Sequence, residues 1–70
     1  MQDIQKKVGA RIRALRLAKG WSQDLFADKS GWHRAHVGEI ERGECNVSLQ
    51  TLKTIADTLG AKVADLVRGI

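Results

Sequence analysis

Apolar residues recur every three or four positions along most of the chain, which is the spacing of helices buried on one side. The pattern predicts a first helix over roughly residues 2–19, with inward residues Ile4, Val8, Ile12 and Leu15. A second strong pattern spans residues 49–59, with inward residues Leu49, Leu52, Ile55, Ala56 and Leu59. The sequence has no proline and no alternating strand pattern, so we expect an all-α fold.

Serine and glycine residues mark the ends of the predicted helices. Ser22 is the expected N-cap of a short helix over residues 23–30, and Ser48 caps the helix over residues 49–59. Glycines follow four of the helices, where a chain commonly turns into the left-handed conformation: Gly20, Gly31, Gly43 and Gly60.

Two of the predicted helices form a helix-turn-helix at about residues 22–42. The helix over residues 23–30 is followed by a three-residue turn and by a helix over residues 34–42. In this arrangement the second helix is exposed on one side and able to enter a DNA major groove. A short fifth helix completes a compact domain over residues 1–70, with inward residues Val63, Leu66 and Val67.

Basic residues gather at the beginning of the chain. Residues 1–20 contain six lysines and arginines and one acidic residue, whereas residues 21–70 contain six basic and seven acidic residues. The net charge is +4 and the pI is about 9.7. This distribution predicts an edge that faces phosphates, with an ordinary solvated helix face as the alternative.

Length and composition exclude several classes of function. The 70 residues form at most one domain and leave no room for a second, ligand-sensing domain. The sequence clusters no nucleophile with a base and an orienting group, so we expect no enzyme, no cofactor and no small-molecule substrate. No apolar stretch is long enough to cross a membrane, and the single Cys45 makes no internal disulfide, so we expect a cytoplasmic protein.

Short segments at fixed spacing over most of the chain carry a family pattern. They are Ile12-Arg13-Ala14-Leu15-Arg16, Trp21-Ser22-Gln23, Phe26-Ala27, Gly31, Val37-Gly38, Ile40-Glu41-Arg42-Gly43, Ser48-Leu49 and the run from Leu52 to Gly60. Together they resemble the Cro/phage-repressor-like helix-turn-helix family, also called the xenobiotic-response-element family. The resemblance implies a repressor-like DNA-binding domain from a bacterium or phage, associated with the nucleoid.

A narrower resemblance involves two segments, His33-Arg34-Ala35-His36-Val37-Gly38 and Gly43-Glu44-Cys45-Asn46-Val47-Ser48-Leu49. They are similar to the His-Arg-Thr-Tyr-Ile/Val-Gly and Gly-Glu-x-Asn-x-Ser/Thr-Leu segments of restriction–modification controller proteins. Ala35 and His36 depart from the usual Thr-Tyr. The resemblance implies a homodimeric repressor or autoregulator on a palindromic operator, and an antitoxin-like or bridging protein-interaction module is the alternative.

The outward side of the helix over residues 34–42 is expected to read bases, through His33, Arg34, Ala35, Gly38 and Glu39. Arg34 has the fork that grips guanine O6 and N7. Glu39 is expected to accept from cytosine N4 or to orient Arg34, and Ala35 suits a thymine methyl group. Gly38 permits close approach to DNA.

Phosphate contacts are expected around this helix. The resemblance implies that Gln23 touches a phosphate, and that the loop after residue 42 lies against the DNA backbone. The candidates are Gln23, His36, Arg42, Asn46, Ser48, Arg11 and Arg13. For Arg11, Arg13 and His36, a solvated surface position is an equally simple interpretation.

Two further sets are expected to be structural. Glu41 falls among inward residues and needs a partner, and the resemblance implies that Arg16 supplies it; Arg16 on a phosphate is the alternative. The dimer interface is predicted from C-terminal apolar residues: Val63, Val67 and Ile70. A metal site from His33, His36 and Cys45 lacks a recognised ligand spacing, so no metal is predicted.

Overall fold

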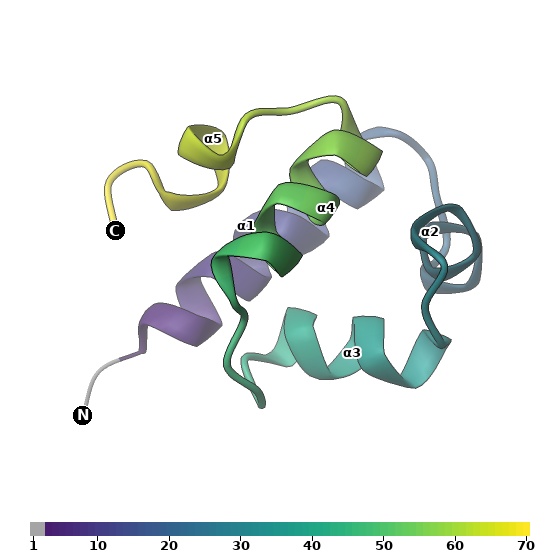
Figure 1. Cartoon of the computed structure of the whole chain (residues 1–70), viewed down its shortest axis with the longest axis horizontal. Helices are drawn as coiled ribbons and strands as arrows, with labels where there is room; N and C mark the ends of the chain where they lie inside the picture. The colour runs from purple at the N-terminus through teal and green to yellow at the C-terminus, as the bar shows by residue number, and fades with distance from the viewer. Residues whose placement is uncertain (1–2) are drawn as a thin grey trace.

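The computed structural model describes residues 3–70 and contains five α-helices and no strand within that range (Figure 1). They are α1 Ile4–Ala18, α2 Gln23–Ser30, α3 Arg34–Arg42, α4 Leu49–Leu59 and α5 Val63–Val67. The all-α, five-helix prediction is confirmed, and α2 and α3 have the predicted bounds. Residue 2, where the sequence pattern starts the first helix, lies outside the described residues.

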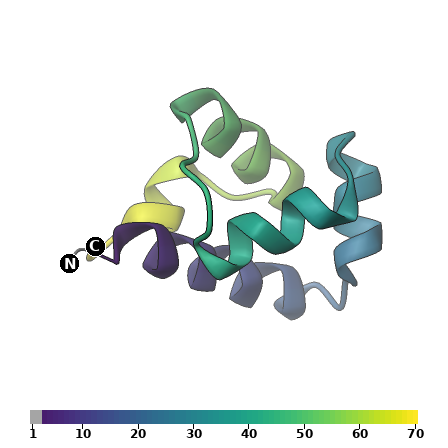
Figure 2. The same cartoon turned by 90° about the horizontal axis from the view of Figure 1, so that it is seen from below.

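The arrangement of the helices leaves one side of α3 uncovered. α1 and α4 run across the middle of the molecule in similar directions, and α3 and α5 lie on opposite sides of them (Figure 1). α2 stands at the end where α3 begins and packs against both α3 and α4. Seen from below, α3 lies in front of the other helices along its whole length (Figure 2).

Serine caps and a glycine turn fix the bounds of the helix-turn-helix and of α4. The Ser22 Oγ accepts a hydrogen bond from the Leu25 N–H at 3.0 Å, and the Ser48 Oγ accepts one from the Thr51 N–H at 3.1 Å. These bonds satisfy N–H groups that the first helical turn leaves without a partner. Gly31 ends α2 with φ of 76°, a left-handed conformation that favours glycine.

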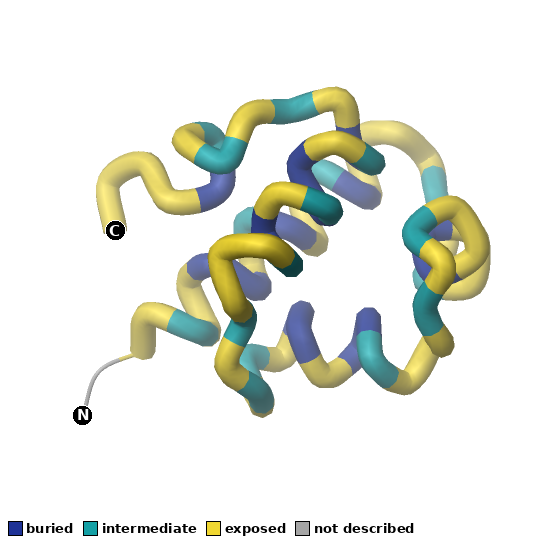
Figure 3. The backbone as a smooth tube through the Cα atoms, in the orientation of Figure 1, coloured by how far each residue is buried: buried dark blue, intermediate teal, exposed yellow. Residues whose placement is uncertain are grey.

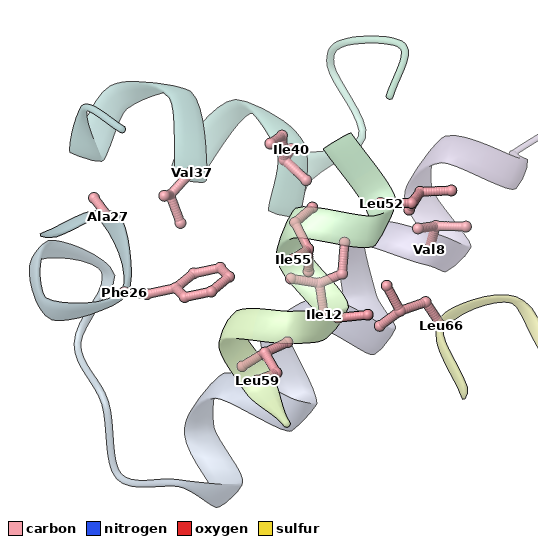
Figure 4. Close-up of a cluster of buried hydrophobic side chains, with 11 residues drawn as sticks. Val8, Ile12, Phe26, Ala27, Val37, Ile40, Leu52, Ile55, Leu59 and Leu66 are labelled. Atoms are coloured by element: carbon pink, nitrogen blue, oxygen red, sulfur yellow. The ribbon is translucent and has the colours of Figure 1, made fainter. Parts of the chain in front are cut away.

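The core is a cluster of apolar side chains contributed by all five helices (Figure 4). Phe26 of α2 points into its centre, and Ile12, Ile55 and Leu66 have no exposed surface. Burying a side chain of this size stabilises the fold by about 1.5–3 kcal/mol. Most of the residues that were predicted to face inward are buried in this core.

Three residues are corrections to the predicted core: Val67, the last residue of α5, is 38% exposed, and Leu49 and Ile4 are the other two. Leu49 is 81% exposed and Ile4 is 48% exposed. Each stands at the first position of its helix, where the periodicity still holds but no neighbouring helix covers the side chain. Periodicity identifies the face of a helix, and packing decides how far along that face the core extends.

Gly9 lets α1 and α3 approach each other closely. A Cβ atom at Gly9 would lie 2.4 Å from the Ile40 carbonyl oxygen and 2.6 Å from that of Glu41. These contacts are with backbone atoms, which no side-chain rotation relieves. The position of α3 is thus set by direct backbone contact with α1.

Candidate nucleic-acid interface

The two sides of α3 have opposite character (Figure 3). Val37 and Ile40 face the core and are at most 3% exposed. The other side carries Arg34, Ala35 and Glu39, which are all exposed. One side of α3 therefore packs against the core, and the other side is accessible to a partner.

A buried polar network ties α3 to α1 and α2. The Arg16 Nε donates to the Glu41 Oε2 at 2.6 Å, and the Arg16 Nη2 donates to the Glu41 Oε1 at 2.9 Å. The Gln23 Nε2 donates to the same Oε1 at 3.1 Å, and the Arg16 Nη1 donates to the Trp21 carbonyl oxygen at 2.8 Å. One carboxylate on α3 thus joins three helices through charge-assisted hydrogen bonds.

The Arg16–Glu41 pair is almost completely removed from water. The two side chains are 6% and 2% exposed. The hydrogen bond to the Glu41 carboxylate raises the pKa of Arg16 above its ordinary value, although burial acts in the opposite direction. The geometry is bidentate, as the guanidinium fork and the carboxylate favour. Arg16 accordingly makes an internal contact, and its guanidinium is not presented to solvent.

A shallow hollow on the outer side of α3 brings together six of the twelve predicted DNA contacts. Its lining is Gln23, Arg34, Ala35, Gly38, Glu39 and Arg42. Four of these were predicted to read bases and two to contact phosphates. His33, also predicted to read bases, is the exposed N-cap residue of α3, makes no side-chain capping bond and does not line the hollow.

Acidic residues that the sequence analysis did not select accompany the basic residues of the hollow. The Arg34 Nε lies 3.6 Å from the Asp24 Oδ1, and both side chains are more than 60% exposed. The Arg42 Nε lies 2.9 Å from the Glu44 Oε2. Hydrogen bonding to Arg42 lowers the pKa of Glu44, and the same bond raises the pKa of Arg42. No sequence signal marks Asp24, because it meets Arg34 only across the turn.

Glu39 does not contact Arg34, which was one of its two predicted roles. The Glu39 Oε1 lies 3.9 Å from the His36 Nδ1, three positions back on the same helix. The His36 ring in turn packs edge-on against Trp32, with the ring centroids 5.3 Å apart. His36 is therefore half-buried and held in place.

Three of the remaining candidate phosphate contacts are exposed on different elements. Asn46 is exposed in the loop after α3, where its Oδ1 accepts a hydrogen bond from the Gln5 Nε2. Ser48 is exposed at the start of α4, and its hydroxyl donates to the Thr51 Oγ1 at 2.9 Å. Arg13 is exposed on α1.

Arg11, predicted to contact phosphate near α3, lies instead against α5, which corrects its predicted placement. Its guanidinium donates to the carbonyl oxygens of Asp65 at 2.8 Å and Arg68 at 3.0 Å. These acceptors belong to α5 and the residue after it, and α5 lies on the opposite side of the molecule from α3 (Figure 1). The C-terminal carbonyls attract this cation, so its positive charge does not contribute to the surface around α3.

The predicted dimer residues differ in exposure. Val63 is half-buried and packs against the core, so it already has an internal role. Val67 is 38% exposed and Ile70 is 37% exposed. Val67 lines an apolar hollow together with Ile4, Val8, Val47 and Leu52, beside Gln5 and Asn46.

Among residues 3–70, no helix is both long enough and apolar enough to span a membrane.

The fold and the exposed α3 define a helix-turn-helix domain, and the sequence agrees. The chain belongs to the helix-turn-helix family HTH_3, which matches residues 12–66. This confirms the predicted relation to the Cro/C1-type regulators.

Its relatives include two control proteins and one restriction–modification controller protein. The chain is 38% identical to control protein C.SmaI of Serratia marcescens, over 91% of this chain and 76% of that protein. It is 37% identical to control protein C.BamHI of Bacillus amyloliquefaciens, over 91% of this chain and 80% of that protein. The solved structure of the restriction–modification controller protein C.AhdI from Aeromonas hydrophila superposes with a TM-score of 0.84 at 44% identity, over 89% of this chain and 94% of that one.

Proposed function

We propose that the protein is a sequence-specific transcriptional regulator that binds a palindromic operator as a homodimer, with α3 in the major groove. The observation that carries the proposal is the hollow on α3. Gly38 lines this hollow but is buried beside the Arg42 guanidinium. The hollow joins an arginine, a carboxylate and a methyl group on one accessible helix face. These are the groups that distinguish base pairs in the major groove.

Within this proposal the base contacts are divided among three residues. Arg34 exchanges its exposed pairing with Asp24 for a bidentate contact with guanine. Glu39 accepts from cytosine N4, and Ala35 packs on a thymine methyl. His33, at the exposed beginning of α3, reaches the edge of the site.

Phosphate contacts position the helix in the groove. Arg42 has a solvent-exposed acidic partner, Glu44, and we propose that a phosphate replaces this carboxylate on binding. Asn46, Ser48 and Arg13 are exposed and remain proposed phosphate contacts. Gln23 has a double role, because its Nε2 is bound to Glu41 while the residue also lines the hollow.

Dimerisation follows from size and from exposed apolar surface. The longest dimension of the chain is 31 Å, which is less than one turn of about 34 Å of B-DNA. One copy therefore reads one half-site. The apolar hollow lined by Ile4, Val8, Leu52 and Val67 is the proposed contact with the second copy. Ile70 is exposed and lines a separate hollow, and it remains a second proposed contact.

The relatives suggest the kind of gene that is controlled. Two are named control proteins, and a third is named a restriction–modification controller protein. We infer that this chain regulates restriction–modification genes and its own gene.

Selection from a random duplex pool tests the proposal. We expect a palindromic winner, and we expect Arg34→Ala to lose discrimination at one base in each half-site. Arg68→Ala is the matched control, because Arg68 is also an exposed arginine beside a carboxylate but lies after α5. If no sequence is enriched, specific readout is excluded and the bridging function takes its place.

A further inference from the structure

Three side chains of the types that bind metal ions lie close together beside the outer face of α3. One donor atom from each of His36, Glu39 and Cys45 lies within 4.8 Å of the others. His33, the third ligand considered from the sequence beside His36 and Cys45, does not belong to the cluster, and Glu39 is the third member instead.

The local fold brings these three residues together. His36 and Glu39 are three positions apart on α3, so their side chains are neighbours on one helix face. The chain then reverses at Gly43, where the Glu44 N–H donates to the Glu39 carbonyl oxygen at 2.9 Å. This reversal carries Cys45 back over the last turn of α3.

We propose that His36, Glu39 and Cys45 form a binding site for a zinc-like divalent cation, with a water molecule or another ligand in the fourth position. A nitrogen, a sulfur and a carboxylate oxygen are the donors that Zn²⁺ accepts, and sites with three protein ligands usually keep the fourth position open. Magnesium and calcium prefer oxygen donors alone, so this set discriminates against them.

The required movement is small. Bond lengths of about 2.0–2.3 Å in a tetrahedral site place ligand atoms roughly 3.3–3.7 Å apart. The His36 Nδ1 and the Glu39 Oε1 are 3.9 Å apart, and both side chains are about half exposed. Rotation of the half-exposed Glu39 side chain toward the His36 ring closes this gap without moving the helix.

The surroundings favour a cation. The carboxylates of Glu39 and Glu44 lie near the Cys45 thiol and place negative charge beside it. This charge attracts a divalent ion, which displaces the thiol proton when the sulfur binds it. Trp32 packs against the His36 ring and limits its orientations, as outer-shell groups do in metal sites.

Cobalt titration of the whole chain, without DNA and with a non-chelating reductant, tests the site directly. We expect one Co²⁺ per chain, a near-ultraviolet thiolate-to-cobalt absorption band, and displacement by Zn²⁺ but not by Mg²⁺ or Ca²⁺. Cys45→Ser should abolish the band. His36→Gln and Glu39→Gln should each weaken Co²⁺ binding at least about tenfold.

Matched variants separate a built site from general attraction. His33→Gln removes a neighbouring histidine outside the cluster, and Glu44→Gln removes the same charge as Glu39→Gln. His33→Gln should bind Co²⁺ much more tightly than His36→Gln, and Glu44→Gln much more tightly than Glu39→Gln. Circular dichroism should show that every variant is folded. Equal losses in Glu39→Gln and Glu44→Gln, or a band that survives His36→Gln unchanged, would overturn the proposal.

A consequence for regulation rests on the proposed function. The ion would hold the loop that carries Asn46 against α3 and add positive charge beside the phosphate contacts. The ion takes one Glu39 carboxylate oxygen and leaves the other to accept from cytosine N4. Zn²⁺ should therefore tighten DNA binding by the wild type and leave Cys45→Ser unchanged. A cobalt band without any DNA binding would leave the metal site standing and reject the DNA function, whereas equal Zn²⁺ effects on both proteins would reject the regulatory consequence.

Discussion

The inner and outer sides of α3 each hold an arginine–glutamate pair, with opposite surroundings. On the inner side, Arg16 and Glu41 are 2.6 Å apart with side chains 6% and 2% exposed. On the outer side, Arg42 and Glu44 are 2.9 Å apart with side chains 58% and 54% exposed. The separation and the charges are similar, so burial makes the difference in what each pair does.

Because the inner pair is buried, neither of its members can be removed without a large loss of stability. The partners of the exposed outer pair can be replaced by other charged groups. Removing one partner of a buried pair leaves a charge without water or a counter-charge, which is strongly destabilising. Water and salt screen the outer pair, which contributes little to stability. A phosphate oxygen can replace the Glu44 carboxylate because solvent already reaches both groups. The inner side therefore positions α3, and the outer side is free to bind.

Breaking the inner pair should have the largest effect. Arg16→Met leaves the Glu41 carboxylate buried, and we expect a loss of about 3–5 kcal/mol in unfolding free energy, measured by urea denaturation. A domain of 70 residues has about 4–10 kcal/mol in all, so this variant should be largely unfolded or marginal.

The double variant Arg16→Met/Glu41→Leu keeps this prediction testable when the single one does not fold. Apolar side chains of similar volume replace both charges, and we expect most of the stability to return. A double variant as unstable as Arg16→Met would mean that the hydrogen bonds to Gln23 and Trp21, and not the uncompensated charge, carry the effect.

The second prediction compares Gly9 of α1, which lies against the α3 backbone, with Gly38 within α3 itself. Gly9→Ala places a methyl group against the Ile40 and Glu41 carbonyl oxygens, and we expect a loss of about 1–3 kcal/mol. Gly38→Ala meets only the flexible end of Arg42, with 2.8 Å to its Nη1, so helix propensity should prevail and add up to about 1 kcal/mol. Thermal or urea unfolding of both variants decides whether backbone contact controls the α1–α3 distance.

The third prediction concerns the outer side alone. Arg34→Ala should leave the unfolding free energy unchanged, because its side chain is 67% exposed. It should cost about 1–3 kcal/mol of discrimination against the wrong base at one position per half-site, measured by competition with single-base operator variants. Uniform weakening on every sequence would assign Arg34 to a phosphate instead.

The fourth prediction addresses the exchange of Arg42 between Glu44 and phosphate. Arg42→Gln should reduce the slope of log affinity against log salt by about 0.9 for each half-site contact. Glu44→Gln removes the competing carboxylate and should strengthen binding on all sequences. An unchanged slope in Arg42→Gln would mean that this arginine stays with Glu44 in the complex.

Sequence reasoning predicted the parts of the molecule that local chemistry determines. The serine caps at Ser22 and Ser48 and the glycine that ends α2 depend on a few neighbouring residues, and the structure agrees with them. Leu49 and Arg11 were misplaced because covering by a neighbouring helix and capture by distant carbonyls depend on tertiary packing.

The candidate site divides in the same way. Gly38, predicted on the same face, is buried, whereas the exposed helical face with Arg34, Ala35 and Glu39 follows from periodicity. Its acidic partners and the approach of Cys45 to Glu39 do not, because they depend on how the chain reverses after α3.

The smallest expected effect is the acid response of the outer pair. The bond to Arg42 lowers the pKa of Glu44 in the folded protein, so its stabilising effect is complete above the ordinary glutamate pKa. This effect is lost as the pH falls through the lowered value. Glu44→Gln should therefore differ slightly from the wild type in unfolding free energy at neutral pH, and the difference should vanish in acid. A difference that persists at low pH would show that Glu44 acts through packing or backbone contacts and not through its charge. The outer pair would then no longer be the exchangeable counterpart of Arg16 and Glu41.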